Sequence, residues 1–547
     1  MSSRLETYLD IWRQGRGPGL STVFPGWPQS GVALAGDFAG IQTFVFRPIP
    51  GAGGAARRLR SRSFRVGACT ELIARWCCGR LSALKARLLY SAGGRFLIGM
   101  EASDDWEKHV VDLQGKIDAW TWRNFEGELV FHLAAAPFDS LKIPRELLQT
   151  ALERRKANPL YGSLCSSEGW LTSEFFRTAS PADSRCASCG STVLTQRTSD
   201  NEDVCEGCLQ DERNGRRLAQ SRFARIVEGT EGDVSALGLA LELHPDKRPD
   251  EAGVWLSLEG GDDKLESWPL FRHVPFEDGR ALDFDEIAKG ASGSRKWLGY
   301  LRIDVDHAGR QFALLRGDPL RTWALSRFLN GFFATEANKL LRTSYPNLYG
   351  VYGGGDDVFV IGPWSDTLDF AHDLRRRFRE LVGGDLTFSA GIALAKPRQH
   401  ILSKAEEAAE ELESAKLVPG HRRSSGRDQI RALSVTCGWD DFDQILPQAK
   451  QVKSWLESGE LSSRFLYQAL ELHRAWLDAK QRSPNRETGS SVRYRPLLYY
   501  QIRRNLKAGA ASQWAHSLLH SPSDWTRVDF VVRYALLAAE RASEEER

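Results

Sequence analysis

The sequence predicts an α+β protein in which two ferredoxin-like βαββαβ units flank a zinc-binding helical insert and precede a helical C-terminal region. Three observations support this class. A glycine turn with two adjacent aspartates lies between two apolar strands, within Tyr352–Gly362. The pattern around it also occurs earlier in the chain, and two Cys-x-x-Cys pairs lie between the copies. Each copy reads as strand, helix, hairpin, helix and strand, which is the ferredoxin-like order.

The first strand of each copy is apolar and ends in a similar segment, and the hairpin and last strand also correspond. We therefore interpret the two regions as copies of one unit. The corresponding segments are Asp37–Phe44 with Asp306–Phe312, Tyr90–Gly99 with the run around Gly354, and Leu129–His132 with Leu386–Ser389.

The second copy carries a candidate metal site. Asp356 and Asp357 leave a hairpin tip where Gly354 and Gly355 let the backbone approach a phosphate, because glycine has no Cβ. Asp304 and Asp306 end an upstream strand and, by alternation, share one of its faces. Pairing of this strand with the hairpin would gather carboxylates that repel one another unless a hard divalent cation neutralises them. The alternative is a polar turn with solvated aspartates.

The first copy lacks most of these ligands. Ala35 stands where the second copy has Asp304, and Arg95 with Phe96 replaces the aspartate pair. We therefore expect only the second copy to catalyse. A similar run, Gly260–Asp263, is followed by polar residues instead of an apolar strand, so we interpret it as an exposed loop.

The insert contains two Cys-x-x-Cys pairs separated by fifteen residues. This spacing predicts one tetrahedral zinc site, and four protein ligands leave no open position, so the predicted role is structural. Two disulfides are the alternative, which the lack of any sign of secretion disfavours. The predicted ligands are Cys186, Cys189, Cys205 and Cys208.

Composition limits the remaining function classes. The 547 residues are 42% hydrophobic, and the formal net charge of +2 argues against a protein that coats nucleic acid by itself. With no signal peptide and no long apolar run, we expect a cytoplasmic protein without a membrane role. One local basic patch either holds phosphates or is a solvated helix face, and it consists of Arg57, Arg58, Arg60, Arg62 and Arg65.

These landmarks divide the chain into five segments. We expect an N-terminal lead at 1–30, the first copy at 31–140, and the zinc-bearing helical insert at 141–295. The second copy then spans 296–440, and a helical domain spans 441–547, where apolar residues recur at helical spacing.

A degenerate first unit, a four-cysteine insert, a second unit with Gly-Gly-Asp-Asp and a helical tail together resemble the large subunit of type III CRISPR effector complexes. The segment Leu498–Asn505 resembles the tail of the Csm-type branch. The resemblance implies that both units are palm domains and that sister subunits, guide RNA and target RNA are partners. It also implies that target RNA activates the joining of ATP into cyclic oligoadenylates.

The chemistry of the residues agrees with this resemblance. Mg²⁺ or Mn²⁺ held by Asp304, Asp356 and Asp357 would activate a ribose 3′-hydroxyl and stabilise the pyrophosphate leaving group. Asp306 is either a further ligand or, as we favour, a hydrogen-bonding acid. By resemblance, Lys416 holds a triphosphate and Ser326 contacts adenine; the alternatives are a surface lysine and a serine bonded to its own helix.

One departure from the family concerns nuclease activity. Many members begin with a histidine-aspartate nuclease domain, but the first predicted palm strand starts near Gly31. We therefore expect no DNA cleavage by this chain, and a III-D-like assignment is as plausible as III-A. Two other functions stay open: a stand-alone nucleotide cyclase, and a catalytically idle scaffold for RNA and sister subunits.

Overall fold

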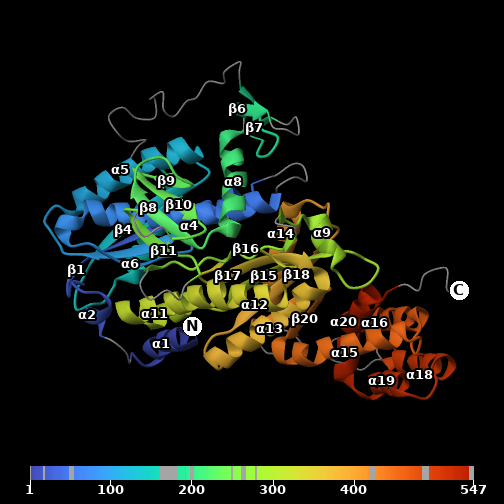
Figure 1. The fold of residues 1–547 in the computed structure, drawn as a ribbon. Coiled ribbons are helices and arrows are strands. Elements are labelled where there is room, and N and C mark those ends of the chain that lie inside the picture. The colour runs from blue at the N-terminus through green and yellow to red at the C-terminus, as the bar shows by residue number, and fades with distance from the viewer. Residues whose placement is uncertain are drawn as a thin grey trace. The chain divides into compact units, whose positions relative to one another are not determined.

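A computed structural model describes residues 2–15, 19–47, 55–160, 183–190, 192–197, 203–247, 251–259, 266–277, 280–417, 426–482 and 492–540. Its contacts divide the chain into two compact units. The first unit comprises Met1–Val274, His307–Thr343 and Gly350–Val358, and the second comprises Pro275–Asp306, Ser344–Tyr349 and Phe359–Arg547. Each is described by itself below, with the element labels of Figure 1.

The first unit contains a four-stranded antiparallel sheet in the order β2-β3-β1-β4. The central strand β1 is almost wholly buried, because the sheet is covered on both faces. Helix α4 packs against β2 and β3, and α5 packs against β4. The elements are β1 (Gly31–Ala39), α3 (Ile41–Val45), α4 (Ala55–Arg80), η1 (Ser82–Leu84), β2 (Arg87–Ala92), β3 (Arg95–Met100), α5 (Trp106–Phe125) and β4 (Val130–Phe138).

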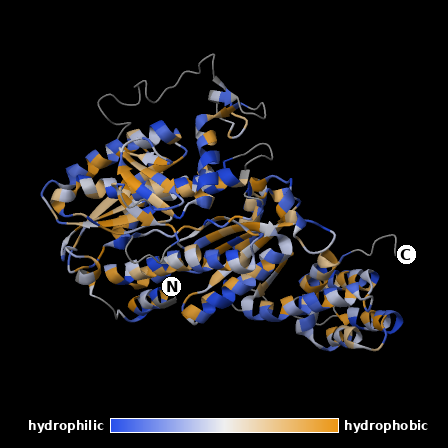
Figure 2. Cartoon of the chain, viewed as in Figure 1, coloured by the Kyte–Doolittle hydropathy of each residue, from blue (hydrophilic) through white to orange (hydrophobic). Residues whose placement is uncertain are grey.

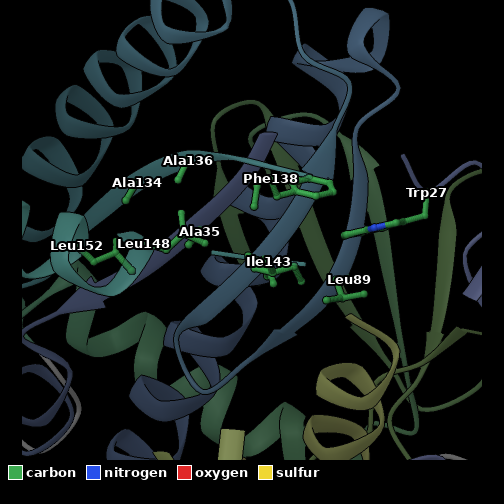
Figure 3. Packing of buried hydrophobic residues seen from close by; sticks show 11 residues of the cluster. Trp27, Ala35, Leu89, Ala134, Ala136, Phe138, Ile143, Leu148 and Leu152 are labelled. Atoms are coloured by element: carbon green, nitrogen blue, oxygen red, sulfur yellow. The ribbon is translucent and has the colours of Figure 1, made fainter. Parts of the chain in front are cut away.

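Helix α6 (Arg145–Ala157) covers the other face of this sheet. Its Leu148 and Leu152, with Ile143 just before it, pack on Ala35 of β1 and on residues of β4 (Figure 3). The core of the first copy therefore extends beyond residue 140, where we had expected the insert to begin.

The described residues of the insert contain strands as well as helices, so a purely helical insert is wrong. Beyond α6 they include a three-stranded sheet, the long helix α8 and a five-stranded sheet in the order β12-β11-β8-β10-β9. In β8, buried residues alternate with half-buried ones, a period-two pattern that favours a strand. The elements are β5 (Asp183–Arg185), β6 (Thr192–Arg197), β7 (Asp203–Cys205), α8 (Glu206–Gln220), β8 (Phe223–Glu228), β9 (Val234–Ala236), β10 (Leu239–His244), β11 (Val254–Ser257) and β12 (Glu266–Ser267).

The remaining helices of the first unit lie in two segments, one at the N-terminus and one at 308–344. Helix α11 (Pro319–Gly331) is capped by Asp318, whose side chain accepts a hydrogen bond from the Arg321 amide at 2.9 Å. The N-terminal helix α1 packs on α11. The elements are α1 (Ser2–Gln14), α2 (Leu20–Val23), α10 (Ala308–Leu314), α11, the π-helical segment η3 (Phe332–Ala337) and α12 (Asn338–Ser344).

A six-stranded sheet has the order β16-β17-β15-β18-β19-β20. Its strands β15 and β18 pair antiparallel within the second unit, and both are mostly buried. The elements are β13 (Phe276–Glu277), β14 (Arg280–Ala281), α9 (Phe284–Lys289), β15 (Leu298–Val305), β16 (Tyr349–Gly354), β17 (Asp357–Pro363), α13 (Trp364–Val382), β18 (Phe388–Ala395), α14 (Ile401–Leu417), β19 (Gln429–Ala432) and β20 (Val435–Gly438).

The C-terminal region is helical, as predicted, and belongs to the second unit. Its core is aromatic: the rings of Tyr494 and Trp525 stack with centroids 4.1 Å apart, and Trp525 is fully buried. The elements are α15 (Trp439–Glu457), α16 (Ser463–Arg482), α18 (Tyr494–Asn505), α19 (Ala510–His520) and α20 (Pro522–Ala538).

Hydropathy follows these elements (Figure 2): the strands of both sheets are largely hydrophobic, whereas the helices alternate between polar and apolar residues. Within the described ranges, no helix combines the length and the apolar character that a membrane span requires. The α+β class predicted from the sequence is confirmed.

Candidate functional site

The predicted glycine turn lies between β16 and β17 in the first unit. Gly354 and Gly355 have φ of +154° and +64°, conformations that residues with a side chain rarely adopt. A Cβ on Gly353 would lie 2.7 Å from the Phe271 ring. Asp356 is exposed at the tip and Asp357 is half-buried. The turn thus brings two carboxylates to the surface on a backbone that depends on glycine.

Asn330 of α11 braces this turn, and we had not predicted it. Its side-chain oxygen accepts a hydrogen bond from the Gly355 amide at 3.4 Å. A Cβ on Gly354 would lie 2.8 Å from the same oxygen. Asn330 follows Ser326 by four residues, so the two share a helix face. This i,i+4 spacing of polar residues in an apolar helix was the signal that could have found it.

Two cavities of the first unit meet at the turn. The larger, about 1230 Å³, is lined by Ser326, Gly355 and Asp356, together with Asp37 and Arg95 of the first copy. The smaller, about 470 Å³, is lined by Gly354, Asp356 and Asp357. Its walls also carry six aromatic side chains, Phe38, Phe46, Phe64, Trp268, Phe271 and Tyr352. The structure therefore brings the predicted residues Ser326, Gly354, Gly355, Asp356 and Asp357 to one region.

Asp304 and Lys416 form an ion pair in the second unit. The Lys416 ammonium lies 3.0 Å from Asp304 Oδ2 and 2.8 Å from Glu413 Oε1. Burial opposes the charged ammonium, but the hydrogen bond to Glu413 and the Asp304 carboxylate outweigh it and raise the pKa of Lys416. Asp304 belongs to one unit, and Asp356 and Asp357 to the other, so a metal site shared by all three stays a prediction.

Asp306 is buried and surrounded by donors. Its carboxylate accepts hydrogen bonds from Thr387 Oγ1 at 2.7 Å, from Ser389 Oγ at 2.8 Å and from the Asp428 amide at 2.8 Å. The Arg427 guanidinium lies 3.7 Å away. A carboxylate with three such donors has little capacity left for a cation, so this geometry favours the hydrogen-bonding role over metal ligation.

The corresponding aspartate of the first copy, Asp37, is bound by cations. Arg95 Nε donates to its Oδ1 at 3.1 Å, and Lys156 Nζ donates to its Oδ2 at 2.6 Å. Lys156, on α6, was not predicted. The wall of the larger cavity that the first copy contributes thus carries Asp37, whose charge is balanced by Arg95 and Lys156.

The strand register corrects one correspondence between the copies. Asp37 faces His132 in the first sheet, whereas Asp304, two residues before Asp306, faces Ser389 in the second. Thr387 is therefore the counterpart of His132, although we had aligned Ser389 with it. A shift of two residues preserves the alternation of buried side chains, so the sequence pattern could not detect it.

The four cysteines of the insert form a compact group. Among the described residues, they alone bring three or more Cys, His, Asp or Glu ligand atoms within 4.8 Å of one another. The Cys189 and Cys205 sulfurs are 3.8 Å apart, as for a tetrahedral zinc ion with Zn–S bonds of about 2.3 Å. Cys205 ends β7 and is the N-cap residue of α8, and Cys208 lies in the first turn of α8. The donor set therefore fits zinc.

The basic patch of the first copy is not a solvated helix face, because Arg58, Arg60 and Arg62 are buried against α8. The alternative, that the patch holds phosphates, stays a prediction. The predicted exposed loop at Gly260–Asp263 lies outside the described residues.

Comparisons with known proteins agree with this architecture. The family model "Cas10/Cmr2, second palm domain" matches residues 297–430, and "Csm1 subunit domain B" matches residues 32–158. Two curated relatives carry the name CRISPR system single-strand-specific deoxyribonuclease Cas10/Csm1 (subtype III-A). That of Mycobacterium tuberculosis is 27% identical over 80% of this chain and 59% of its own length. That of Thermococcus onnurineus is 27% identical over 86% and 64%.

Solved structures show the same fold. A crystal structure of an apo Csm1-Csm4 cassette matches with a TM-score of 0.68 and 20% identity, over 96% of this chain and 72% of that chain. The cassette in complex with cA4 matches with a TM-score of 0.67. The chain spans about three fifths of the length of the two curated relatives. These matches identify the chain as a homologue of the Cas10/Csm1 large subunits of CRISPR systems, with a Cas10-type second palm domain at residues 297–430.

Proposed function

We propose that this chain is the large subunit of a type III CRISPR RNA-guided effector complex and that its second copy joins ATP into cyclic oligoadenylates when target RNA binds. The observation that carries the proposal is the glycine turn, from which Asp356 lines both cavities and Asp357 lines the smaller one; Ser326 also lines the larger. The match of this copy to a Cas10 palm supports it. Related cassettes have been solved in complex with one ATP, cA3 and cA4.

Both sheets are, in this proposal, ferredoxin-like palms. The strand order β2-β3-β1-β4 puts the hairpin on one side of the first strand and the last strand on the other. The order β16-β17-β15-β18 repeats this arrangement, and two further strands follow at its edge. The common order supports a duplication in which the first palm kept the fold without the ligands.

Asp304, Asp356 and Asp357 would hold Mg²⁺ or Mn²⁺, since carboxylate oxygens are the ligands that hard divalent cations prefer. The bound cations would supply activation of a ribose 3′-hydroxyl and stabilisation of the pyrophosphate leaving group. Gly354 and Gly355 leave space for a triphosphate beside the turn. Ser326 would contact the adenine, and Asp306 would hold the end of β15 to β18 through its hydrogen bonds.

Lys416 would bind the triphosphate. It is nearly buried, with 12% of its side chain exposed, and it keeps its charge because Asp304 and Glu413 lie beside it. Its ammonium contacts Asp304, so binding of a triphosphate would exchange that carboxylate for phosphate oxygens.

The cysteine group would bind one structural zinc ion. Four thiolates complete a tetrahedral coordination and leave no position for substrate. We expect one zinc per chain in elemental analysis of the purified protein. Cys186→Ser and Cys205→Ser should each reduce solubility or assembly more than the intrinsic chemistry. Purified, active protein that contains no zinc would overturn this assignment.

Sister subunits, a guide RNA and a target RNA are the proposed partners. A related Csm1-Csm4 subcomplex, solved within a type III-A CRISPR-Csm interference complex, supports the first of these. The curated relatives are named deoxyribonucleases, and this chain matches about three fifths of their length. The absence of DNA cleavage by this chain therefore stays a prediction.

The test is reconstitution with guide RNA and sister subunits, followed by analysis of the products from ATP with Mg²⁺ or Mn²⁺. We expect cyclic adenylates only when target RNA is present. Products that form equally without RNA would favour a stand-alone cyclase. No product from an assembled complex that binds target RNA would favour an idle scaffold. Labelled single-stranded DNA in the same reaction tests the nuclease prediction, and we expect it to stay intact.

A further inference from the structure

The first three turns of α4 carry five arginines that pack against α8 instead of pointing into solvent. Arg60 and Arg62 are each 1% exposed and Arg58 is 6% exposed, which is rare for arginine unless its charge is compensated. The two helices approach closely, because a Cβ on Gly215 of α8 would lie 2.4 Å from the Arg57 carbonyl oxygen. Arg60 donates a hydrogen bond to the Gly215 carbonyl.

Two carboxylates of α8 face these arginines. Asp211 accepts hydrogen bonds from Arg62 Nε at 3.2 Å and from Ser61 Oγ at 3.3 Å, and Arg65 lies 3.8 Å from it. Asp211 is 3% exposed. It therefore serves as a buried anchor for three side chains on one face of α4.

The second carboxylate, Glu212, is shared among several partners. Arg57 lies 3.0 Å and Arg58 lies 3.5 Å from its oxygens. Arg216 of its own helix is also paired with it at 2.6 Å. Arg57, Arg58, Arg62 and Arg65 of α4 and Arg216 of α8 thus share these two carboxylates. These seven groups together carry an excess of three positive charges.

The cysteine group lies beside this excess charge. Arg62 Nη2 is 3.8 Å from Cys208 Sγ, and Cys208 is three residues before Asp211 on α8. A zinc ion bound by four thiolates carries two net negative charges. A charge of that size, in a buried position next to Arg62, would offset most of the excess.

We propose that the zinc–tetrathiolate centre is the counter-charge of the α4 arginine cluster and that Arg62 and Asp211 are positioning residues that couple it to the smaller cavity. Arg60, Ser63, Phe64 and Gly67 of α4 and Leu218 of α8 line that cavity together with the glycine turn. Zinc therefore fixes one wall of the cavity without touching its contents. This inference rests on the proposed zinc site and on nucleotide binding at the turn.

The test compares zinc retention in full-length variants, measured by competition with a chromophoric chelator. Arg62→Met should weaken zinc binding by about 10- to 100-fold, the usual effect of removing a partner that lies just outside a metal's ligands. Arg62→Lys keeps the charge and should stay within a few-fold of the parent. Arg75→Met is the matched control, because Arg75 lies on the same helix but pairs with Glu71 and Glu266. Its zinc affinity should equal that of the parent.

A second measurement avoids dependence on one buried substitution. Hydrogen exchange of the parent after zinc is chelated should speed up at 55–67 of α4 and recover when zinc is restored, while α5 should not change. Asp211→Asn should speed up exchange in the same segment. Equal zinc affinity of Arg62→Met and Arg75→Met, or unchanged exchange of α4 after chelation, would overturn the proposal.

The experiment also separates this inference from the proposed function. Neither zinc affinity nor hydrogen exchange requires turnover of ATP. If a nonhydrolysable ATP analogue binds the parent, the zinc-depleted protein should bind it at least several-fold more weakly. If Arg62→Met weakens zinc binding but the parent does not bind the analogue, the coupling of Arg62 to zinc stands. The proposed function and the effect of zinc on nucleotide binding are then contradicted.

Discussion

The two copies contain a buried aspartate at the end of their first strand, and they satisfy it with different donors. In the first copy, Asp37 is held by two cations, Arg95 and Lys156. In the second copy, the three hydrogen bonds to Asp306 come from two hydroxyls and a backbone amide, which are neutral. The acid is therefore bound directly by two cations in the first copy, whereas in the second its hydrogen bonds come from neutral donors and the Arg427 guanidinium lies 3.7 Å away.

The residues that follow the two glycine turns also differ in charge. Gly93 and Gly94 precede Arg95 with φ of +59° and +82°, so the first copy keeps a glycine turn but follows it with a cation. The second copy follows its turn with two aspartates. The backbone was retained in both, and the charge was reversed in one. This difference explains why we assign cation binding, and with it catalysis, to the second copy alone.

The largest expected effect tests that assignment. Asp356→Ala combined with Asp357→Ala should lower ATP polymerisation by at least about 1000-fold, or about 4 kcal/mol, because the cation loses its ligands. Assembly and RNA binding should stay near those of the parent, since the turn is exposed. Asp262→Ala with Asp263→Ala is the matched control. If polymerisation survived the loss of Asp356 and Asp357 but required Asp262 and Asp263, our choice between the two motifs would be wrong.

The next effect concerns stability. Asp306→Ala leaves the buried Ser389 hydroxyl and two half-buried donors without their acceptor and should lower the free energy of unfolding by about 3 kcal/mol. Asp37→Ala should cost less, about 1 kcal/mol, because Arg95 is 57% exposed and water can solvate its charge. Urea unfolding of the two variants measures the difference. A larger loss for Asp37→Ala would contradict the contrast between the copies.

A pH effect should appear in the first copy. Burial lowers the pKa of His132, which faces Asp37, to about 4; Lys156 adds to this effect and Asp37 opposes it. Between pH 6.5 and 4 the unfolded chain binds a proton that the folded chain does not. Stability should therefore be full above pH 6.5 and fall as the pH drops towards 4, by at most about 1.4 kcal/mol per pH unit for this histidine.

Urea titrations at pH 7 and pH 5 measure this loss. His132→Gln should reduce it, whereas His109→Gln, an exposed position on α5, should not. Burial also lowers the pKa of His473 to about 4, so part of the loss should persist in the His132 variant. An unchanged loss in His132→Gln would show that this histidine does not stay neutral in the folded protein.

The smallest effect concerns Lys416, which contacts Asp304 in the unliganded protein. Lys416→Gln should strengthen Mn²⁺ binding without nucleotide by about two- to fivefold, since a partly exposed ion pair contributes up to about 1 kcal/mol. The same variant should weaken ATP binding. Calorimetry measures both. Weaker Mn²⁺ binding without nucleotide would contradict competition between the lysine and the metal.

The sequence predicted the parts that depend on local pattern. The two copies, the glycine turn, the cysteine spacing and the helical tail each follow from periodicity or from residue types that a turn or a metal demands. Asn330 and Lys156 were missed, because their roles arise only when α11 approaches the turn and α6 covers the first sheet. The strands of the insert were missed because each has six residues or fewer, which is too short for alternation alone to identify a strand.

Tertiary packing buries arginines of α4 that the sequence suggests are at the surface. The arginines of α4 read as a surface patch because nothing local indicates their partners, Asp211 and Glu212, which lie about 150 residues later. The sequence also could not show that Thr387, and not Ser389, corresponds to His132. Register is fixed by pairing across the sheet, and alternation alone leaves it ambiguous by two residues.

Counting bound Mn²⁺ by electron paramagnetic resonance tests the contrast between the copies most directly, with the purified chain, Mn²⁺ and a nonhydrolysable ATP analogue. The account predicts that the parent binds Mn²⁺, that Asp356→Ala with Asp357→Ala loses it, and that Asp37→Ala binds as much as the parent. Full Mn²⁺ binding in the Asp356 and Asp357 variant, or its loss in Asp37→Ala, would contradict the assignment of the cation to the second copy.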